Sequence, residues 1–238
     1  MKRIILSSAL LVAAHLTASP QIVMNVDAAK RGPETSPYQY GLFFEEINHA
    51  GDGGLYAELV RNRSFEEALE GWSSVGNATL ATFTSSLLNS VQKTAVCITT
   101  TGASETNMKG IANEGFWGMG IVKDSTYTLS FYAKGPAGYT GKIHARLVSN
   151  DGKTVIGEAT TEGTVNPGKW TKQTATIKAT ATDKQAHLQL VTSYGGQLYA
   201  DMISLFPYTW KNRKNGLRPD LAQLLADTKP TFLRFPGG

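Results

Sequence analysis

Residues 65–207 are rich in Thr, Ser, Ala, Gly and β-branched residues, and they constrain the fold more than any other part of the chain. Apolar and polar residues alternate there in short runs, which indicates half-buried strands. Clusters such as Gly135-Pro136 and Asn150-Asp151-Gly152 separate the runs and predict hairpin turns. The runs are Tyr127–Ala133, Lys142–Val148, Thr171–Ala179, Ala186–Thr192 and Leu198–Leu205. We therefore predict an antiparallel β-sandwich, of jelly-roll type.

The segments on either side of this region have a different periodicity. Tyr40–Ile47 is an aromatic-rich strand candidate, and a helix is expected after it because Leu55, Leu59 and Val60 lie near one face at helical spacing. A second helix is expected in Leu217–Asp227, and a strand in Thr231–Phe235. Helix-to-strand units of this kind build parallel sheets and (β/α)₈ barrels. The prediction is a mainly β chain: a jelly-roll sandwich inserted into the start of an incomplete (β/α)₈ barrel, cut before the barrel is finished.

The N-terminus predicts export. Met1-Lys2-Arg3 is basic, Ile4–Ala14 is apolar, and Ala18 ends a small-residue cleavage site, which together are typical of a secretory signal peptide. The alternatives are a buried helix and a membrane span, and a membrane span needs about 20 apolar residues to cross a bilayer. The expected division is a signal peptide in 1–18, N-terminal strands and the first barrel strand and helix in 19–64, the sandwich in 65–208 and the barrel start in 209–238. The mature chain is expected to be secreted or periplasmic, without a membrane span.

Charge and cysteine content exclude several classes of function. Removal of Lys2 and Arg3 takes two units from the formal charge of +4, and the remaining Lys and Arg form no cluster. Nucleic-acid binding therefore has no electrostatic basis here. Cys97 is the only cysteine, which excludes an intrachain disulfide and a thiolate metal cage. Its alternating surroundings in Thr94–Thr99 predict a small buried side chain on a strand.

Three motifs resemble glycoside hydrolase family 51 α-L-arabinofuranosidases. The first and longest runs from Tyr40-Gly-Leu-Phe-Phe-Glu-Glu-Ile-Asn-His to Val60 and continues through Arg61-Asn-Arg-Ser-Phe-Glu66. The others are Asn215-Gly-Leu-Arg-Pro-Asp220 and Phe232-Leu-Arg-Phe-Pro-Gly-Gly238. The middle region resembles the carbohydrate-binding sandwich modules inserted at this point in many members. The resemblance implies a secreted enzyme that removes terminal arabinofuranosyl groups from arabinan and arabinoxylan with retention of configuration.

A retaining mechanism needs two carboxylates roughly 5 to 5.5 Å apart, and in this family both are glutamates on later barrel strands. We therefore expect no catalytic residue in these 238 residues, and no cofactor for catalysis. Glu45 and Glu46 cannot be the pair, because consecutive strand residues point to opposite faces. The resemblance instead gives Glu45 a substrate-binding role; the alternative is a solvated carboxylate at a strand end.

The resemblance also suggests that Arg234, Gly237 and Gly238 border the sugar pocket, although Arg234 fits a structural pairing inside the barrel equally well. For His49 a hydrogen-bonded loop position is favoured over a sugar contact. Gly51-Asp52-Gly53-Gly54 lacks the lysine of a phosphate loop and is interpreted as a turn.

The sandwich raises the question of a second kind of site. Its candidate aromatic platforms for a glycan are Trp72, Trp117, Tyr132, Trp170 and Tyr199, with Trp117 and Tyr132 preferred; most of the five are expected to be core. The resemblance further suggests a structural calcium near the first and last sandwich strands, with Glu66 and Asp201 as oxygen ligands.

Three hypotheses follow. The favoured one is the N-terminal part of a secreted arabinofuranosidase, inactive by itself, with plant cell-wall polysaccharide as its partner. The alternatives are a non-catalytic secreted glycan-binding protein, and a sandwich that only positions the barrel and has no affinity for sugar.

Overall fold

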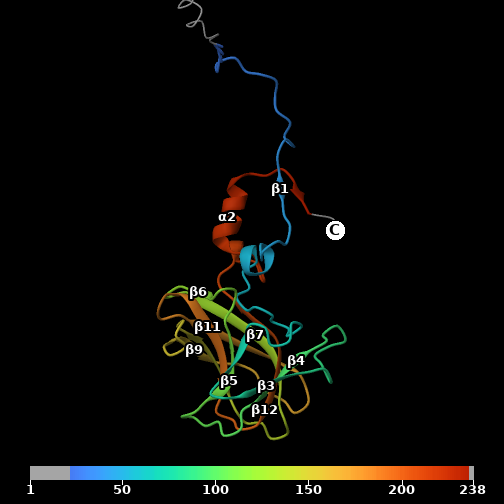
Figure 1. Cartoon of the computed structure of the whole chain (residues 1–238), viewed down its shortest axis with the longest axis vertical. Coiled ribbons are helices and arrows are strands. Elements are labelled where there is room, and N and C mark those ends of the chain that lie inside the picture. The colour runs from blue at the N-terminus through green and yellow to red at the C-terminus, as the bar shows by residue number, and fades with distance from the viewer. Residues whose placement is uncertain (1–21, 236–238) are drawn as a thin grey trace, which may run out of the picture. The chain divides into compact units, whose positions relative to one another are not determined.

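A computed structural model describes residues 22–235 (Figure 1). The predicted signal peptide and the glycines at 237 and 238 lie outside the described residues. The chain divides into a first unit that ends at Gln39 and a second that begins at Tyr40. Residues 22–39 form turns and irregular backbone. No helix in the described range is long and apolar enough to cross a membrane.

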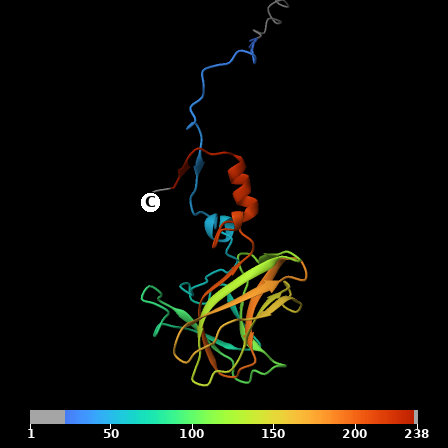
Figure 2. The same cartoon turned by 180° about the vertical axis from the view of Figure 1, so that it is seen from behind.

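The second unit contains a sandwich of two antiparallel sheets, seen from opposite sides in Figures 1 and 2. One sheet has the strand order β10-β7-β12-β4-β3. Its strands are β3 Thr79–Phe83, β4 Ala95–Thr99, β7 Thr126–Lys134, β10 Thr171–Lys178 and β12 Gln197–Phe206. The other sheet has the order β2-β5-β11-β8-β9, with β6 also paired to β11. Its strands are β2 Trp72–Val75, β5 Lys109–Asn113, β6 Met119–Ile121, β8 Ile143–Val148, β9 Val155–Thr160 and β11 Asp183–Thr192.

The sandwich core lies between the inner faces of the two sheets. In β7 the residues Tyr127, Leu129 and Phe131 are buried, and the polar residues between them face outward. Leu188 and Leu190 of β11 contribute in the same way from the opposite sheet. The period of two seen in the sequence is thus the period at which side chains enter this core. The predicted sandwich is confirmed.

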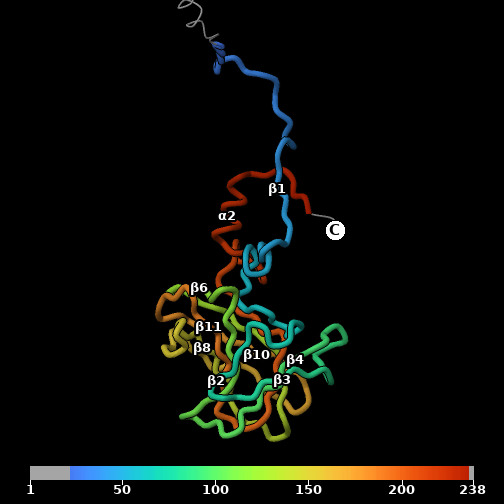
Figure 3. Tube along the Cα trace, viewed as in Figure 1, coloured from blue at the N-terminus to red at the C-terminus, as the bar shows by residue number. Residues whose placement is uncertain are grey.

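One predicted hairpin is wrong. β7 and β8 are consecutive in the chain, yet β7 pairs with β10 and β12 whereas β8 pairs with β11 and β9. The segment between them therefore crosses from one sheet to the other. Figure 3 shows the course of the chain as a continuous trace. Turn residues indicate that a strand ends, but they do not decide which sheet the next strand joins. The β8–β9 hairpin is present as predicted.

The start of a parallel sheet flanks the sandwich. β1 Leu42–Phe43 pairs in parallel with β13 Leu233–Arg234, and α2 Pro219–Asp227 precedes β13. Pro219 occupies the first turn of α2, where its missing N–H costs nothing. Both strands are shorter than predicted, but their parallel pairing through a helix confirms the strand–helix–strand start of a barrel-type sheet.

The helix predicted after the first strand is absent, and this prediction is wrong. Only a single helical turn, η1 Gly51–Leu55, forms there, and it contains non-helical backbone at Asp52 and Gly53. The chain then runs extended because its backbone pairs with the chain returning from the sandwich. The Ala57 N–H donates to the Gly216 carbonyl at 3.2 Å, and the Leu59 N–H donates to the Leu205 carbonyl at 3.1 Å.

Two buried polar side chains hold the entrance to the sandwich. Glu58 Oε1 accepts hydrogen bonds from the Val60 and Leu205 N–H groups, at 3.0 and 2.8 Å. Asn113 uses both ends of its amide: Oδ1 accepts from the N–H groups of Arg61 and Gly115, and Nδ2 donates to the carbonyls of Arg61 and Gly71. Buried polar groups stabilise a fold when they are paired in this way. Asn113 fixes the start of the turn that follows β5.

Candidate functional site

The loop after β1 contains the two adjacent glutamates, which have different surroundings. Glu46 Oε2 accepts hydrogen bonds from the Gly51 and Asp52 N–H groups, at 2.6 and 3.3 Å, and so closes the loop. Glu45 is exposed, two residues beyond the end of β1. The Glu46 carboxylate is therefore occupied by the fold, while that of Glu45 faces solvent and is free to meet a ligand.

Arg234 lies at the same sheet edge as Glu45. It pairs in register with Phe43, and its guanidinium carbon is 5.8 Å from the centre of the Phe43 ring. Parallel strands bring their carboxyl ends to one edge, and alternate residues share a face. The Phe44 N–H also donates to the Arg234 carbonyl at 3.0 Å, so the strand pairing reaches the residue before Glu45. The sequence-predicted residues Gly237 and Gly238 lie beyond the described range.

A turn of the sandwich reaches this loop from the side. Between β5 and β6, Phe116 and Trp117 each place their ring centre 5.4 Å from the His49 ring. A Cβ on Gly53 would lie 2.5 Å from the Phe116 ring, so the glycine is what lets Phe116 approach. His49, interpreted from sequence as a hydrogen-bonded loop residue, packs here on two aromatic rings.

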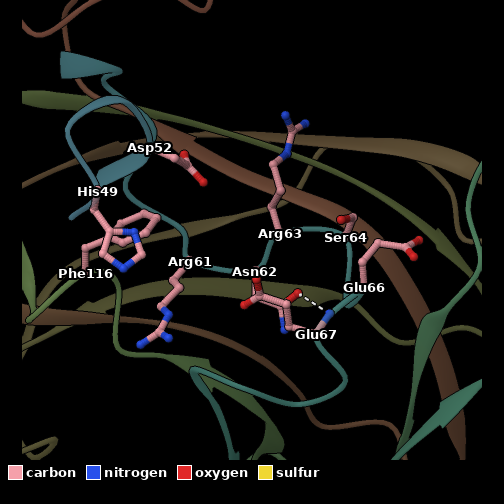
Figure 4. Close-up of a pocket in the computed structure, with 9 residues that line it drawn as sticks. All are labelled: His49, Asp52, Arg61, Asn62, Arg63, Ser64, Glu66, Glu67 and Phe116. Atoms are coloured by element: carbon pink, nitrogen blue, oxygen red, sulfur yellow. Dashed lines mark hydrogen bonds between the residues drawn. The ribbon is translucent and has the colours of Figure 1, made fainter. Parts of the chain in front are cut away.

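A polar cavity of about 190 Å³ lies between this loop and the chain that enters the sandwich (Figure 4). Burial raises the pKa of the Asp52 carboxyl, and repulsion from Glu46 adds to the effect. The Glu67 N–H donates to Asn62 Oδ1, which fixes the lower wall. The lining residues are His49, Asp52, Arg61, Asn62, Arg63, Ser64, Glu66, Glu67 and Phe116. Charges of both signs line the cavity, which suits a polar ligand.

The two carboxylates suggested as calcium ligands differ in their exposure to solvent. Asp201 is fully buried in β12, at the point where the register with β7 shifts. Its Oδ1 accepts from the Met202 N–H at 2.7 Å, whereas its Oδ2 has no hydrogen-bond partner among the described residues. Burial raises the pKa of Asp201 to about 7, helped by the negative charge of Glu66. Glu66 is exposed, and its Oε1 accepts from the Lys93 N–H at 2.8 Å.

The candidate platform residues are distributed over different parts of the sandwich. Trp72 is core: its ring lies 4.9 Å from Phe65, and its indole N–H donates to the Asn62 carbonyl. Trp117, by contrast, is 73% exposed. Tyr132 is partly buried on the outer face of the sheet that contains β7, directly across from Asp201 and Lys172.

Trp170 and Tyr199 belong to an aromatic cluster that the sequence did not reveal. The Lys134 ammonium lies 5.1, 4.8 and 5.4 Å from the ring centres of Phe83, Trp170 and Tyr199. Both Lys134 and Trp170 also donate to the Ser86 carbonyl. A lysine therefore fills the space between these rings. The only feature of the sequence that pointed to Lys134 was its position two residues after Tyr132, on the same face of the strand.

A second feature missed from sequence is a groove of about 780 Å³ on the outer face of β7 and β10. Hydroxyl groups of Thr128, Ser130 and Thr174 line one side, and Tyr208 lies among the residues that follow β12 on the other. The sequence indicated this groove only through the Ser and Thr residues that alternate with apolar residues and therefore face outward.

The comparisons agree with this architecture. Residues 57–196 match the model of the carbohydrate binding domain family CBM_4_9. Alpha-L-arabinofuranosidase 1 of Arabidopsis thaliana is 35% identical over 235 residues, which is 92% of this chain and 34% of that protein. Alpha-L-arabinofuranosidase A of Aspergillus kawachii is 38% identical over 87% of this chain and 34% of its own length. The structure of an arabinose-bound GH51 α-L-arabinofuranosidase superposes with a TM-score of 0.77 at 36% identity, covering 84% of this chain and 34% of the other.

Proposed function

Given that this chain belongs to the carbohydrate binding domain family through residues 57–196, we propose that it is the N-terminal part of a secreted, retaining α-L-arabinofuranosidase. The proposed whole protein releases terminal arabinofuranosyl groups from arabinan and arabinoxylan. One observation carries the proposal: the similarity to an arabinofuranosidase covers 92% of this chain, so it extends well beyond the carbohydrate-binding module of residues 57–196.

The chain spans about a third of the length of the curated relatives that it matches. The barrel-type elements carry exposed apolar side chains in keeping with this, namely Phe43, Leu224, Phe232, Leu233 and Phe235. Exposed apolar residues gathered in this way fit a surface that other elements cover. In the proposed whole protein, later barrel strands and helices pack there.

In the proposed function, this chain helps to bind the sugar, and residues of later barrel strands cleave the bond. Retention requires one carboxylic acid to protonate the leaving oxygen and one carboxylate to attack the anomeric carbon, and the family places both on later strands. In this chain Glu45 accepts hydrogen bonds from the hydroxyls of the arabinofuranosyl ring. Arg234, with Gly237 and Gly238, borders the same pocket. The signal-like residues 1–18 support export, to the medium or the periplasm.

Arabinose release tests this function. The whole protein encoded by the gene is expected to release arabinose from an aryl α-L-arabinofuranoside and from arabinoxylan, while residues 19–238 alone release none. If the whole protein released arabinose from neither substrate, the proposal would be contradicted. That result would favour the alternative, a non-catalytic glycan-binding protein, for which the groove over β7 and β10 is the supporting observation.

We also propose that Glu66 and Asp201 hold a structural calcium ion. The unpartnered Oδ2 of buried Asp201 fits an oxygen-seeking cation, because an ionised carboxylate without a partner is costly to bury. Within the described residues no group of three or more His, Cys, Asp or Glu side chains is present to hold a metal. Carbonyl oxygens and water would therefore have to complete the coordination of calcium, which takes six to eight oxygens.

Calcium is expected to stabilise residues 19–238 against heat. At about 100 times the dissociation constant, the gain is about 2.7 kcal/mol, or roughly 5–10 °C in Tm for a unit of this size. Asp201→Asn should abolish the response and Glu66→Gln should weaken it, whereas Glu67→Gln at the neighbouring exposed site should leave it unchanged. Calorimetry with calcium and with a chelator measures this. Equal responses of wild type and Asp201→Asn would refute the assignment.

A further inference from the structure

The turn between β5 and β6 presents a large aromatic side chain to solvent. Trp117 is 73% exposed, so the sandwich core does not account for its presence. The turn is nevertheless tightly built: the Gly118 N–H donates to the Glu114 carbonyl at 3.1 Å, and a Cβ on Gly118 would lie 2.4 Å from the Gln185 Cα. Asn113 fixes the turn from inside. The fold therefore holds Trp117 in one place without burying it.

The backbone here is also strained. Trp117 has φ 59°, and across the contact Asn48 and His49 have φ 54° and 61°. The left-handed conformation costs a residue other than glycine roughly 1–2 kcal/mol. Such strain persists only where the surrounding structure imposes it, and it gathers at ligand sites. Here two such residues, Trp117 and His49, meet at one contact between the sandwich and the loop after β1, and Asn48 directly precedes His49.

A polar cavity of about 380 Å³ adjoins Trp117. Asn150 Nδ2 donates to Gln185 Oε1 at 3.2 Å. This bond leaves the side-chain N–H groups of Gln185 and the side-chain oxygen of Asn150 available to a ligand. The lining residues are Arg61, Glu114, Trp117, Gly118, Asn150, Gln185 and His187. An aromatic face beside a few converging donors and acceptors is the composition of a sugar-binding site.

We propose that Trp117 and this cavity form a subsite for the xylose backbone of a neutral, β-linked xylan chain. The proposal rests on the arabinofuranosidase function proposed above. A pyranose ring offers the indole a flat C–H face, which a puckered furanose ring does not. Arg61 is ion-paired with Glu70, and Glu114 is the carboxylate that lines the cavity, so a neutral sugar fits it better than a uronate. The outer groove over β7 and β10 is a separate surface, lined by other residues.

The position of the subsite gives it a role in the reaction. Trp117 contacts His49, which belongs to the loop after β1. In barrel enzymes the loops at the carboxyl ends of the strands form the active site. A xylan chain bound on Trp117 is thereby directed along the edge that carries Glu45 and Arg234. The inserted sandwich thus selects the polymer that bears the arabinofuranosyl group, and small substrates do not reach this subsite.

Two measurements test the proposal. In the first, residues 19–238 labelled with ¹⁵N are titrated with xylohexaose and, separately, with arabinohexaose. The Trp117 indole N–H signal, assigned by its loss in Trp117→Ala, is expected to shift with xylohexaose. No shift with xylohexaose would overturn the proposal, and a shift with arabinohexaose alone would overturn the xylan assignment.

In the second, the whole protein carries Trp117→Ala. We expect kcat/KM to fall roughly tenfold for arabinoxylan and to stay within about twofold for an aryl α-L-arabinofuranoside; Trp117→Tyr should restore much of the loss. Tyr38→Ala, a tyrosine with the same 73% exposure in the first unit, is the control. Unchanged arabinoxylan kinetics in Trp117→Ala would refute the subsite. A wild type inactive on both substrates would refute the enzymatic function, and the titration would still decide the subsite.

Discussion

Replacing Glu45 by glutamine in the whole protein is expected to lower kcat/KM for an aryl α-L-arabinofuranoside by about 10- to 100-fold. The exposed carboxylate of Glu45 lies just past β1, at the edge shared with Arg234. A hydrogen bond to a charged group contributes about 1.5–3 kcal/mol, which corresponds to that range. Because Glu45 holds no structural element together, Tm should stay within about 1 °C of the wild type, in line with surface substitutions in general.

Glu46→Gln is the matched control, because it makes the same chemical change one residue away. Its amide oxygen can still accept from the Gly51 and Asp52 N–H groups that Glu46 now holds. We expect a change in kcat/KM of less than about threefold, since only the charge of that hydrogen bond is lost. Equal losses in the two variants would mean that the loop, and not the Glu45 carboxylate, is what the substrate requires. No loss in Glu45→Gln would remove Glu45 from the site.

The largest effect on stability is expected from Glu58→Ala. Glu58 is 2% exposed and accepts from two buried N–H groups, those of Val60 and Leu205, which join the entry and exit segments of the sandwich. Each N–H left without a partner costs about 1–3 kcal/mol. The free energy of unfolding of residues 19–238 should therefore fall by about 2–4 kcal/mol in urea titrations. Glu58→Gln, which keeps the accepting oxygen, should cost less than half as much.

The wild type and Glu58→Gln together also give a test of pH dependence. Burial raises the pKa of Glu58 above its ordinary value of 4.5, and this outweighs the nearby Ser204 and Arg63, which favour the charged form. The folded state therefore binds the proton more tightly than the unfolded state does. The resulting stabilisation is complete below pH 4.5 and is lost as pH rises through the folded pKa. The stability of wild type minus that of Glu58→Gln should thus decrease with rising pH, and an increase would show that Arg63 controls the charge of Glu58.

The sandwich was predictable from sequence because its strands are buried on one face. Tyr127, Leu129 and Phe131 alternate with polar residues, and that pattern survives any choice of neighbouring strand. The partner of each strand was not predictable, since β8 follows β7 directly and still joins the other sheet. The helix expected around Leu55 failed for a related reason. Pairing with Gly216 and Leu205, more than 140 residues away, holds that segment extended and overrides its local periodicity.

The substrate-binding roles of Glu45 and Arg234 came from the family resemblance, and they stay predictions. What the strand pattern predicted is their location, because both residues lie at the carboxyl ends of paired parallel strands. The contact of His49 with Phe116 and Trp117 depends on the docking of a sandwich turn against the loop after β1, and no spacing in the sequence encodes that. Likewise, the suggestion that Glu66 and Asp201 share a calcium ion came from family resemblance, because nearly the whole sandwich separates them in the sequence, and it stays a prediction.

The stereochemistry of the first product tests the central proposal most directly. The whole protein is mixed with an aryl α-L-arabinofuranoside in an NMR tube, and the anomeric proton of the released arabinose is followed before mutarotation. Two carboxylates acting in a double displacement predict that the α-anomer appears first. Initial appearance of the β-anomer would contradict the retaining mechanism, and failure to release arabinose at all would contradict the assignment of this chain to an arabinofuranosidase.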